Sequence, residues 1–159
     1  MKYGVLITAR LKSKRLKKKL LKKIKNQNLI SFLINRLKIQ FPKKKIVLIT
    51  SKLKQDKPLI DISKNLKINF FCGESLDVLK RIYDAAERFK FSNIISCTAD
   101  NPFIDTKEAK KMIKFHIKNN HDLTIMKGLP IGMFTYGVKV SAIKKILKIK
   151  RVKNTETWG

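Results

Sequence analysis

Cysteine, proline, glycine and acidic residues are all scarce in this chain of 159 residues. The two cysteines, Cys72 and Cys97, are too few and too isolated for a disulfide framework or a zinc site. Both stand in apolar runs, which predicts buried free thiols. No Gly/Ser-rich linker and no internal repeat divides the sequence. These absences favour one domain over residues 1–159, and 43% apolar content is enough for a sizeable core.

Long hydrophobic runs are also missing. No apolar stretch approaches the about 18 residues that a membrane-spanning helix needs. The basic start of the chain is not followed by the apolar region of a signal peptide. We therefore expect a cytoplasmic protein without a membrane span.

Negative charge is the scarcest property of the chain. Eleven acidic residues stand against 38 lysines and arginines, which gives a formal net charge of +27. By itself this excess would suggest nucleic acid, an anionic membrane or polyphosphate as a partner. However, only six of the basic residues are arginines, and the lysines are spread through nearly every segment. Phe32, Phe70, Phe71 and Phe115 fall on predicted core positions instead of forming an exposed platform, so no nucleic-acid partner is expected.

Short apolar runs alternate with amphipathic stretches, which is typical of βαβ units and a parallel sheet. Strands are predicted at 3–8, 45–50, 68–72, 93–98, 123–126 and 135–140. Helical periodicity lies between them, for example in the apolar spacing of Leu29, Phe32, Leu33 and Leu37. Ser75 and Thr106 are predicted to cap the two helices that follow the third and fourth strands. The pattern predicts an α/β fold.

The segment that follows the first strand concentrates cationic donors. Arg10, Ser13, Arg15 and Lys19 stand within ten positions, where the carboxyl end of a parallel strand opens a ligand crevice. Guanidinium groups match phosphate oxygens bidentately, and an ammonium group adds a mobile point charge. The segment predicts either a phosphate-binding loop or part of a lysine-rich surface.

Other polar residues follow the third and fourth strands. Asp100 predicts either a ligand for Mg²⁺, which takes one or two carboxylates plus phosphate oxygens and water, or a turn-forming aspartate ahead of Pro102. Because parallel strand ends converge, the loop with Arg10 and Lys19 should lie near Asp100. Gly73 and Arg81 open onto the same edge, although a helix arginine also suits solvent. His116 and His121 show no ligand spacing, and surface positions are expected for both.

Three ordered motifs in these segments resemble the acylneuraminate (CMP-sugar) cytidylyltransferase superfamily, in particular its spore-coat polysaccharide biosynthesis branch. The first motif is matched by Ala9, Arg10, Ser13, Arg15, Leu16, Lys19 and Leu21. The second is matched by Gly73, Asp77, Val78, Leu79 and Arg81. The third is matched by Thr98, Ala99, Asp100, Pro102, Ile104 and Asp105. The resemblance implies a three-layer fold with a mostly parallel sheet of the nucleotide-diphospho-sugar transferase (Rossmann-like) type.

The resemblance also implies a function. The chain would transfer CMP from CTP to a sugar, an acidic sugar of surface polysaccharide, and release pyrophosphate. Arg10 and Lys19 would be catalytic, and Arg10, Ser13, Arg15, Lys19, Gly73 and Arg81 would bind the nucleotide. Asp100 would hold Mg²⁺ as the cofactor. The partners implied are CTP and a sugar substrate, with a homodimer as the assembly.

The chain departs from the family in two ways. Lys12 replaces a glycine common in the first motif, and Lys17 and Lys18 replace a usual Pro-Gly pair before Lys19. Family members usually continue past 154–159, so the chain is expected to lack the C-terminal portion that adds sugar-binding, metal-binding and dimer-forming elements. These departures leave open a second hypothesis, a catalytically incomplete nucleotide-binding remnant or subunit. A third hypothesis, a nucleic-acid binder driven by charge, ranks last because of the predicted core positions of the phenylalanines.

Overall fold

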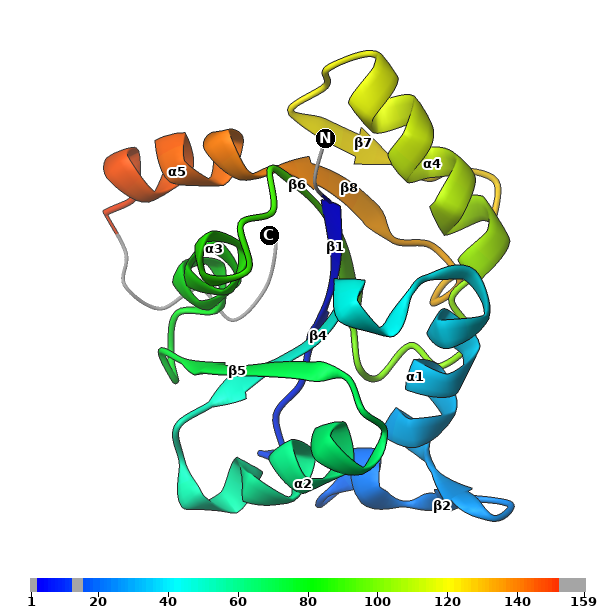
Figure 1. Cartoon of the computed structure of the whole chain (residues 1–159). Helices are drawn as coiled ribbons and strands as arrows, with labels where there is room; N and C mark the ends of the chain where they lie inside the picture. The colour runs from blue at the N-terminus through cyan, green and yellow to red at the C-terminus, as the bar shows by residue number, and fades with distance from the viewer. Residues whose placement is uncertain (1–2, 13–15, 152–159) are drawn as a thin grey trace.

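A computed structural model describes residues 3–12 and 16–151, which form one mixed sheet with helices on both faces (Figure 1). The order in the sheet is β5-β4-β1-β6-β8-β7. These strands span Tyr3–Thr8 (β1), Ile46–Ser51 (β4), Asn69–Gly73 (β5), Asn93–Thr98 (β6), Leu123–Ile125 (β7) and Tyr136–Lys139 (β8). The helices span Leu29–Gln40 (α1), Lys57–Asn65 (α2), Val78–Arg88 (α3), Thr106–Lys118 (α4) and Val140–Ile149 (α5). A small hairpin pairs β2 (Lys23–Ile24) with β3 (Gln27–Asn28).

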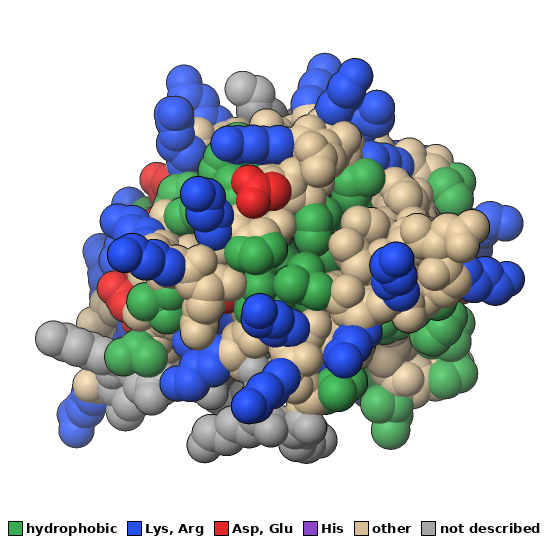
Figure 2. Space-filling model, turned by 90° about the horizontal axis from the view of Figure 1, so that it is seen from below, with side chains coloured by type: hydrophobic (Ala, Val, Ile, Leu, Met, Phe, Trp, Pro, Cys, Tyr) green, Lys and Arg blue, Asp and Glu red, His purple; other side chains and the backbone are tan. Residues whose placement is uncertain are grey.

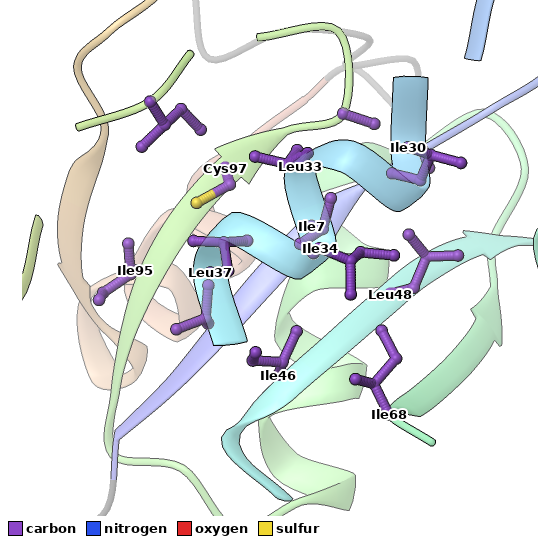
Figure 3. Close-up of a cluster of buried hydrophobic side chains, with 14 of the residues drawn as sticks. Ile7, Ile30, Leu33, Ile34, Leu37, Ile46, Leu48, Ile68, Ile95 and Cys97 are labelled. Carbon is purple, nitrogen blue, oxygen red and sulfur yellow. The ribbon is translucent and has the colours of Figure 1, made fainter. Parts of the chain in front are cut away.

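The sheet separates two apolar layers. One layer packs α1, α2 and α4 against alternate strand residues such as Ile7, Ile46 and Leu48, and Figure 3 shows α1 lying over these side chains. The other layer packs α3 and α5 against the opposite residues, including Leu6 and Val47. Because neighbouring strand residues point to opposite faces and both faces are covered, the central strands read as continuous apolar runs. The expected three-layer α/β fold is confirmed.

All six predicted strands are present, with ends that differ by at most one residue. β1, β4, β5 and β6 run parallel, whereas β8 is antiparallel to β6 and β7 is antiparallel to β8. The sheet is therefore mostly parallel, as expected.

Both predicted helix caps are wrong. The carboxylate of Asp77, not the hydroxyl of Ser75, accepts the hydrogen bond that caps α3, from the backbone N of Lys80 at 2.9 Å. Glu74 accepts from the amides of Ser75 and Leu76 and closes a turn there, which delays the helix start. Asp105, not Thr106, caps α4 by accepting from two backbone amides, each at 3.0 Å.

Several predictions of exposure also need correction. His116 is fully buried instead of lying on the surface, because its Nδ1 lies 2.8 Å from the hydroxyl of Thr124 on β7. Phe70 and Phe115 are exposed, at 37% and 54%, because Phe70 lies on the edge strand β5 and Phe115 lies outside the buried face of α4. Cys97 is buried as predicted, and Cys72 is half-buried.

Candidate active site

The parallel strands bring four loops to one edge of the sheet. Thr8 at the end of β1 lies in register with Thr98 at the end of β6, and the amide of Ala99 donates to the carbonyl of Thr8 at 3.0 Å. On its other side, β1 continues beside β4, and the amide of Ala9 donates to the carbonyl of Ile49 at 3.0 Å. The segments that follow β1, β4, β5 and β6 therefore start side by side, which is where ligands bind in open α/β sheets.

Lys19 and Asp100 meet at this edge although 81 positions separate them in sequence. The Nζ of Lys19 lies 2.6 Å from Oδ2 of Asp100, and the two side chains are 34% and 46% exposed. Burial raises the pKa of Asp100, but the hydrogen bond and charge of Lys19 outweigh it and hold that pKa below its ordinary value. Asp100 is thus an ionised carboxylate beside an ammonium group, both open to a ligand.

The loop that carries Lys19 is anchored at both ends. Leu11 and Leu20 are buried, at 5% and 3% exposure, in the same apolar layer. Between them Lys18 adopts a left-handed conformation with φ 50° and ψ 35°. Lys18 stands where the cytidylyltransferase superfamily that the chain resembles usually has glycine. The backbone at Lys18 therefore keeps the left-handed conformation that glycine favours. A non-glycine residue in this region costs about 1–2 kcal/mol.

Arg10 leaves β1 half-buried and next to Ala9, at the base of the same loop. Its charge helps to lower the pKa of Arg81, which places the two guanidinium groups within electrostatic reach of each other. The predicted phosphate ligands Ser13 and Arg15 lie outside the described residues. The structure therefore brings Lys19 to Asp100 and Arg10 toward Arg81.

The expectation that Arg81 faces solvent from its helix is wrong, because the side chain is buried, at 1% exposure. Its Nη1 donates to the backbone carbonyl of Glu74 and lies 3.5 Å from that of Ser75. Burial, followed by the charge of Arg10, lowers its pKa. Gly73 makes this arrangement fit, since an added Cβ would lie 2.8 Å from the ring of Phe71 and 3.0 Å from Cγ of Arg81. In this structure Arg81 thus contacts the 74–75 backbone from within the protein.

Sequence reasoning missed Asp56 and Ser51. Asp56 is fully buried, and its Oδ1 accepts from the amide of Leu11 at 2.8 Å. Its Oδ2 accepts from the hydroxyl of Ser51, the last residue of β4. The signal was present in the sequence: an acidic residue in a chain with few of them, shortly after the end of a predicted strand and directly before a helix.

A further loop lies against the Asp100 segment. The amide of Asp105 donates to the carbonyl of Met133 at 2.8 Å, and Gly132 has φ +88° beside the side chain of Asn101. Together with the cap that Asp105 provides for α4, these contacts hold the segment between Asp100 and α4 at both ends.

The acidic side chains suit a metal that is held largely by its substrate. Within residues 3–12 and 16–151, no three or more His, Cys, Asp or Glu side chains gather as they would in an all-protein metal site. Asp56 is fully buried and each of its oxygens already accepts a hydrogen bond, whereas Asp100 is half exposed and ionised. One accessible carboxylate fits Mg²⁺ that is held mainly by substrate phosphate oxygens and water.

The basic side chains are spread over this end of the molecule. Figure 2 views the protein from the end toward which β1 runs in Figure 1, and Lys and Arg side chains are separated there by apolar and other side chains. Among the described residues no helix is long and apolar enough to cross a membrane.

Two curated proteins are similar in sequence to this chain. A 31% identical relative is the uncharacterized protein MJ1063 of Methanocaldococcus jannaschii, matched over 93% of this chain and 61% of that protein. The spore coat polysaccharide biosynthesis protein SpsF of Bacillus subtilis is 28% identical over 94% of this chain and 64% of its own length. The chain thus spans less than two thirds of the length of these curated relatives.

Solved structures share the fold. A cytidylyltransferase from Leptospira borgpetersenii superposes with a TM-score of 0.90 at 26% identity, over 96% of this chain and 66% of that one. A CMP:2-keto-3-deoxy-manno-octonic acid synthetase complexed with CTP superposes with a TM-score of 0.72 at 11% identity, over 96% of this chain and 80% of that one. The cytidylyltransferase family model matches residues 4–156. With the Lys19–Asp100 pair at the shared edge of β1 and β6, this match shows that the chain belongs to the cytidylyltransferase family.

Proposed function

We propose that the protein transfers CMP from CTP to a hydroxyl group of an acidic sugar and releases pyrophosphate. The observation that carries the proposal is the Lys19–Asp100 pair, a cation and an anion exposed together where the ends of β1 and β6 meet. A nucleoside triphosphate needs cations for its phosphates and a carboxylate for its metal ion, and this edge offers both.

The reaction needs positioning and charge neutralisation more than covalent chemistry. The sugar oxygen attacks the α-phosphorus in line, the bond from that phosphorus to the bridging oxygen breaks, and the sugar hydroxyl loses its proton to the surroundings. Lys19 and Arg10 bind the phosphate oxygens and stabilise the charge that develops on the pyrophosphate leaving group. Lys19 gains this role when phosphate oxygens replace Asp100 as its partner.

Asp100 is the residue proposed to hold Mg²⁺. When bound, Mg²⁺ supplies further neutralisation of phosphate charge. Asp100 suits this because Lys19 keeps its pKa low, so the carboxylate is ionised at neutral pH. Ser13 and Arg15 are proposed as additional phosphate ligands, and Gly73 and Arg81 as the residues that shape the loop beside the nucleoside.

The substrate class follows from charge and from the relatives. The chain has 38 basic and 11 acidic residues, and the resulting net charge of +27 attracts anionic substrates. The name of SpsF refers to spore coat polysaccharide biosynthesis, and we extend that context to this chain as an acidic sugar of a surface polysaccharide. A homodimer and a cytoplasmic location belong to the same proposal.

Pyrophosphate release from CTP, measured with acidic sugars and with their neutral analogues, tests the proposal. The wild-type chain should release pyrophosphate only with Mg²⁺ and an acidic sugar, and Lys19→Ala should lose the activity. Lys17→Ala is the matched control, because Lys17 is an exposed lysine two positions away.

Thermal protection by CTP, UTP, GTP and ATP, with and without Mg²⁺, separates the alternatives. Protection by CTP without turnover would assign a binding role only. Equal protection by all four nucleotides, lost steeply with salt, would contradict the proposal and indicate binding driven by charge.

A further inference from the structure

Asp56 is a buried carboxylate whose partners belong to two other segments. It is fully buried, accepts from the amide of Leu11 at 2.8 Å, and accepts from the hydroxyl of Ser51 through its other oxygen. The Ser51 oxygen in turn accepts from the amide of Leu53 at 3.2 Å. Asp56 therefore connects the end of β4 to the loop that follows β1.

Capping does not explain this carboxylate. Asp56 occupies the N-cap position of α2, where aspartate ordinarily accepts from the first amides of its own helix. Its side chain accepts no such hydrogen bond. The carboxylate faces Leu11 instead, across 45 positions of sequence. A buried charge is costly unless it is paired and hydrogen-bonded, so its orientation toward Leu11 requires a reason.

The position of Leu11 supplies the reason. Leu11 follows Arg10 directly and begins the loop that ends at Lys19. The side chain of Leu11 is anchored in the apolar layer, and its amide is held by Asp56. Side chain and backbone of one residue are thereby fixed at the point where the chain leaves β1.

The charge of Asp56 also acts on Arg81. It raises the pKa of Arg81, whereas burial and the charge of Arg10 lower that pKa. Asp77 and Glu74 act in the same direction on Arg81. The charge of Asp56 thus favours the charged form of Arg81, as do the charges of Asp77 and Glu74.

We propose that Asp56 is a positioning residue that holds the Leu11 amide and thereby positions the neighbouring Arg10, at the start of the loop after β1, for binding nucleotide phosphates. The role rests on the proposed function, because it concerns affinity for CTP. It places a determinant of nucleotide binding in the segment that follows β4, outside all three motifs identified in the sequence.

Two substitutions at one position test the role. Asp56→Ala removes the acceptor for Leu11 and should weaken CTP affinity about tenfold or more, since the Leu11 amide is left buried without its partner. Asp56→Asn retains an oxygen for Leu11 and offers an N–H to the Ser51 oxygen, so it should restore most of the affinity. Calorimetric titration with CTP and Mg²⁺ gives the affinities, and hydrogen exchange at the Leu11 amide should accelerate in Asp56→Ala only.

Controls separate positioning from general loss of stability. Ile143→Ala removes a buried side chain from α5 on the opposite layer and should lower the melting temperature with CTP affinity unchanged within about twofold. Ser51→Ala keeps the hydrogen bond from the Leu11 amide to Asp56, so its CTP affinity should stay within about threefold of wild type. If Asp56→Ala does not fold, Ser51→Ala and Asp56→Asn remain as the variants to compare.

The outcomes are distinguishable. Wild-type protein that does not bind CTP overturns the proposed function and this role with it. Wild-type binding with unchanged affinity in Asp56→Ala overturns the positioning role alone. Binding by Asp56→Asn that is as weak as binding by Asp56→Ala also overturns it, because the charge and not the Leu11 hydrogen bond would then be decisive.

Discussion

The carboxyl edge of the sheet holds charged groups at two depths. Lys19 and Asp100 form an exposed pair on the surface of this edge, and each is the other's charged partner. Asp56 and Arg81 are buried, at 0% and 1% exposure. Asp56 accepts from the backbone amide of Leu11 and the hydroxyl of Ser51, and Arg81 donates to the backbone carbonyl of Glu74. Both regions lie beyond the carboxyl ends of the parallel strands, the exposed pair after β1 and β6 and the buried groups after β4 and β5.

The difference in burial indicates that the exposed pair and the buried groups have different roles. An exposed ion pair contributes only about 0–1 kcal/mol to stability, so the Lys19–Asp100 pair is readily exchanged for contacts to a ligand. Buried charges that hold backbone groups are costly to disturb, because each partner would be left unsatisfied. We infer that the exposed pair contributes to chemistry and the buried groups to the shape of the loops.

The largest effect is expected from Lys19→Ala. Loss of a cation that stabilises charge in the transition state should reduce turnover by about 10²–10³-fold. The melting temperature should stay near that of wild type, because the pair is exposed. Steady-state pyrophosphate release and thermal unfolding measure the two quantities. A large loss of stability together with activity would remove the distinction between the two regions.

The second effect concerns the buried region. Arg81→Ala removes the donor to the Glu74 carbonyl and the stem that packs on Gly73, and should cost about 2 kcal/mol of unfolding free energy. Urea unfolding measures this cost. Arg88→Ala is the matched control, because Arg88 is exposed in the last turn of the same helix and its loss should change stability by less than about 0.5 kcal/mol. Equal effects of the two substitutions would contradict a structural role for Arg81.

Much of this arrangement could be predicted from sequence. The strands were predictable because each central strand is a short apolar run buried on both faces, as in β1 and β6. The approach of Lys19 to Asp100 was predictable because parallel strands end at one edge. These inferences need only local composition and the direction of the chain.

The remainder depended on choices between side chains that sequence does not settle. Asp56 accepts from the Leu11 amide across 45 positions, and its place directly before a helix marks it as a candidate but predicts an ordinary helix cap, not this partner. Asp77 caps α3 because Glu74 has already closed a turn over Ser75. His116, on α4, is buried, and its Nδ1 lies 2.8 Å from the hydroxyl of Thr124 on β7, a contact that helical periodicity does not predict.

A smaller effect is expected within the exposed loop. Lys18→Gly should stabilise the protein by up to about 1 kcal/mol, because glycine adopts the left-handed conformation of this position without the cost of a Cβ. Lys17→Gly is the control, since Lys17 is equally exposed but lacks the positive φ, and it should be neutral or destabilising. Chemical unfolding of both variants checks the difference. A loss of stability in Lys18→Gly would show that the lysine side chain, and not the backbone, determines this turn.

The smallest effect separates titration in the core from titration at the site. Burial, followed by the positive charges of His121 and Lys139, lowers the pKa of His116 below 6.5, with Asp122 opposing. The unfolded chain then binds the proton more readily than the folded protein. The contribution of His116 is therefore complete above the unfolded pKa and is lost as pH falls below 6.5 toward the folded pKa.

Unfolding of the wild type and His116→Asn in urea, at about pH 7.5 and about pH 5.5, measures this contribution. The wild type should lose more stability on acidification than the variant, because the variant has no imidazole at this position to take up a proton on unfolding. An unchanged pH dependence in His116→Asn would contradict the assignment. Asp100 stays ionised over this pH range because its pKa is held below the ordinary value, so acid destabilisation centred on α4 and β7 should leave the site unchanged.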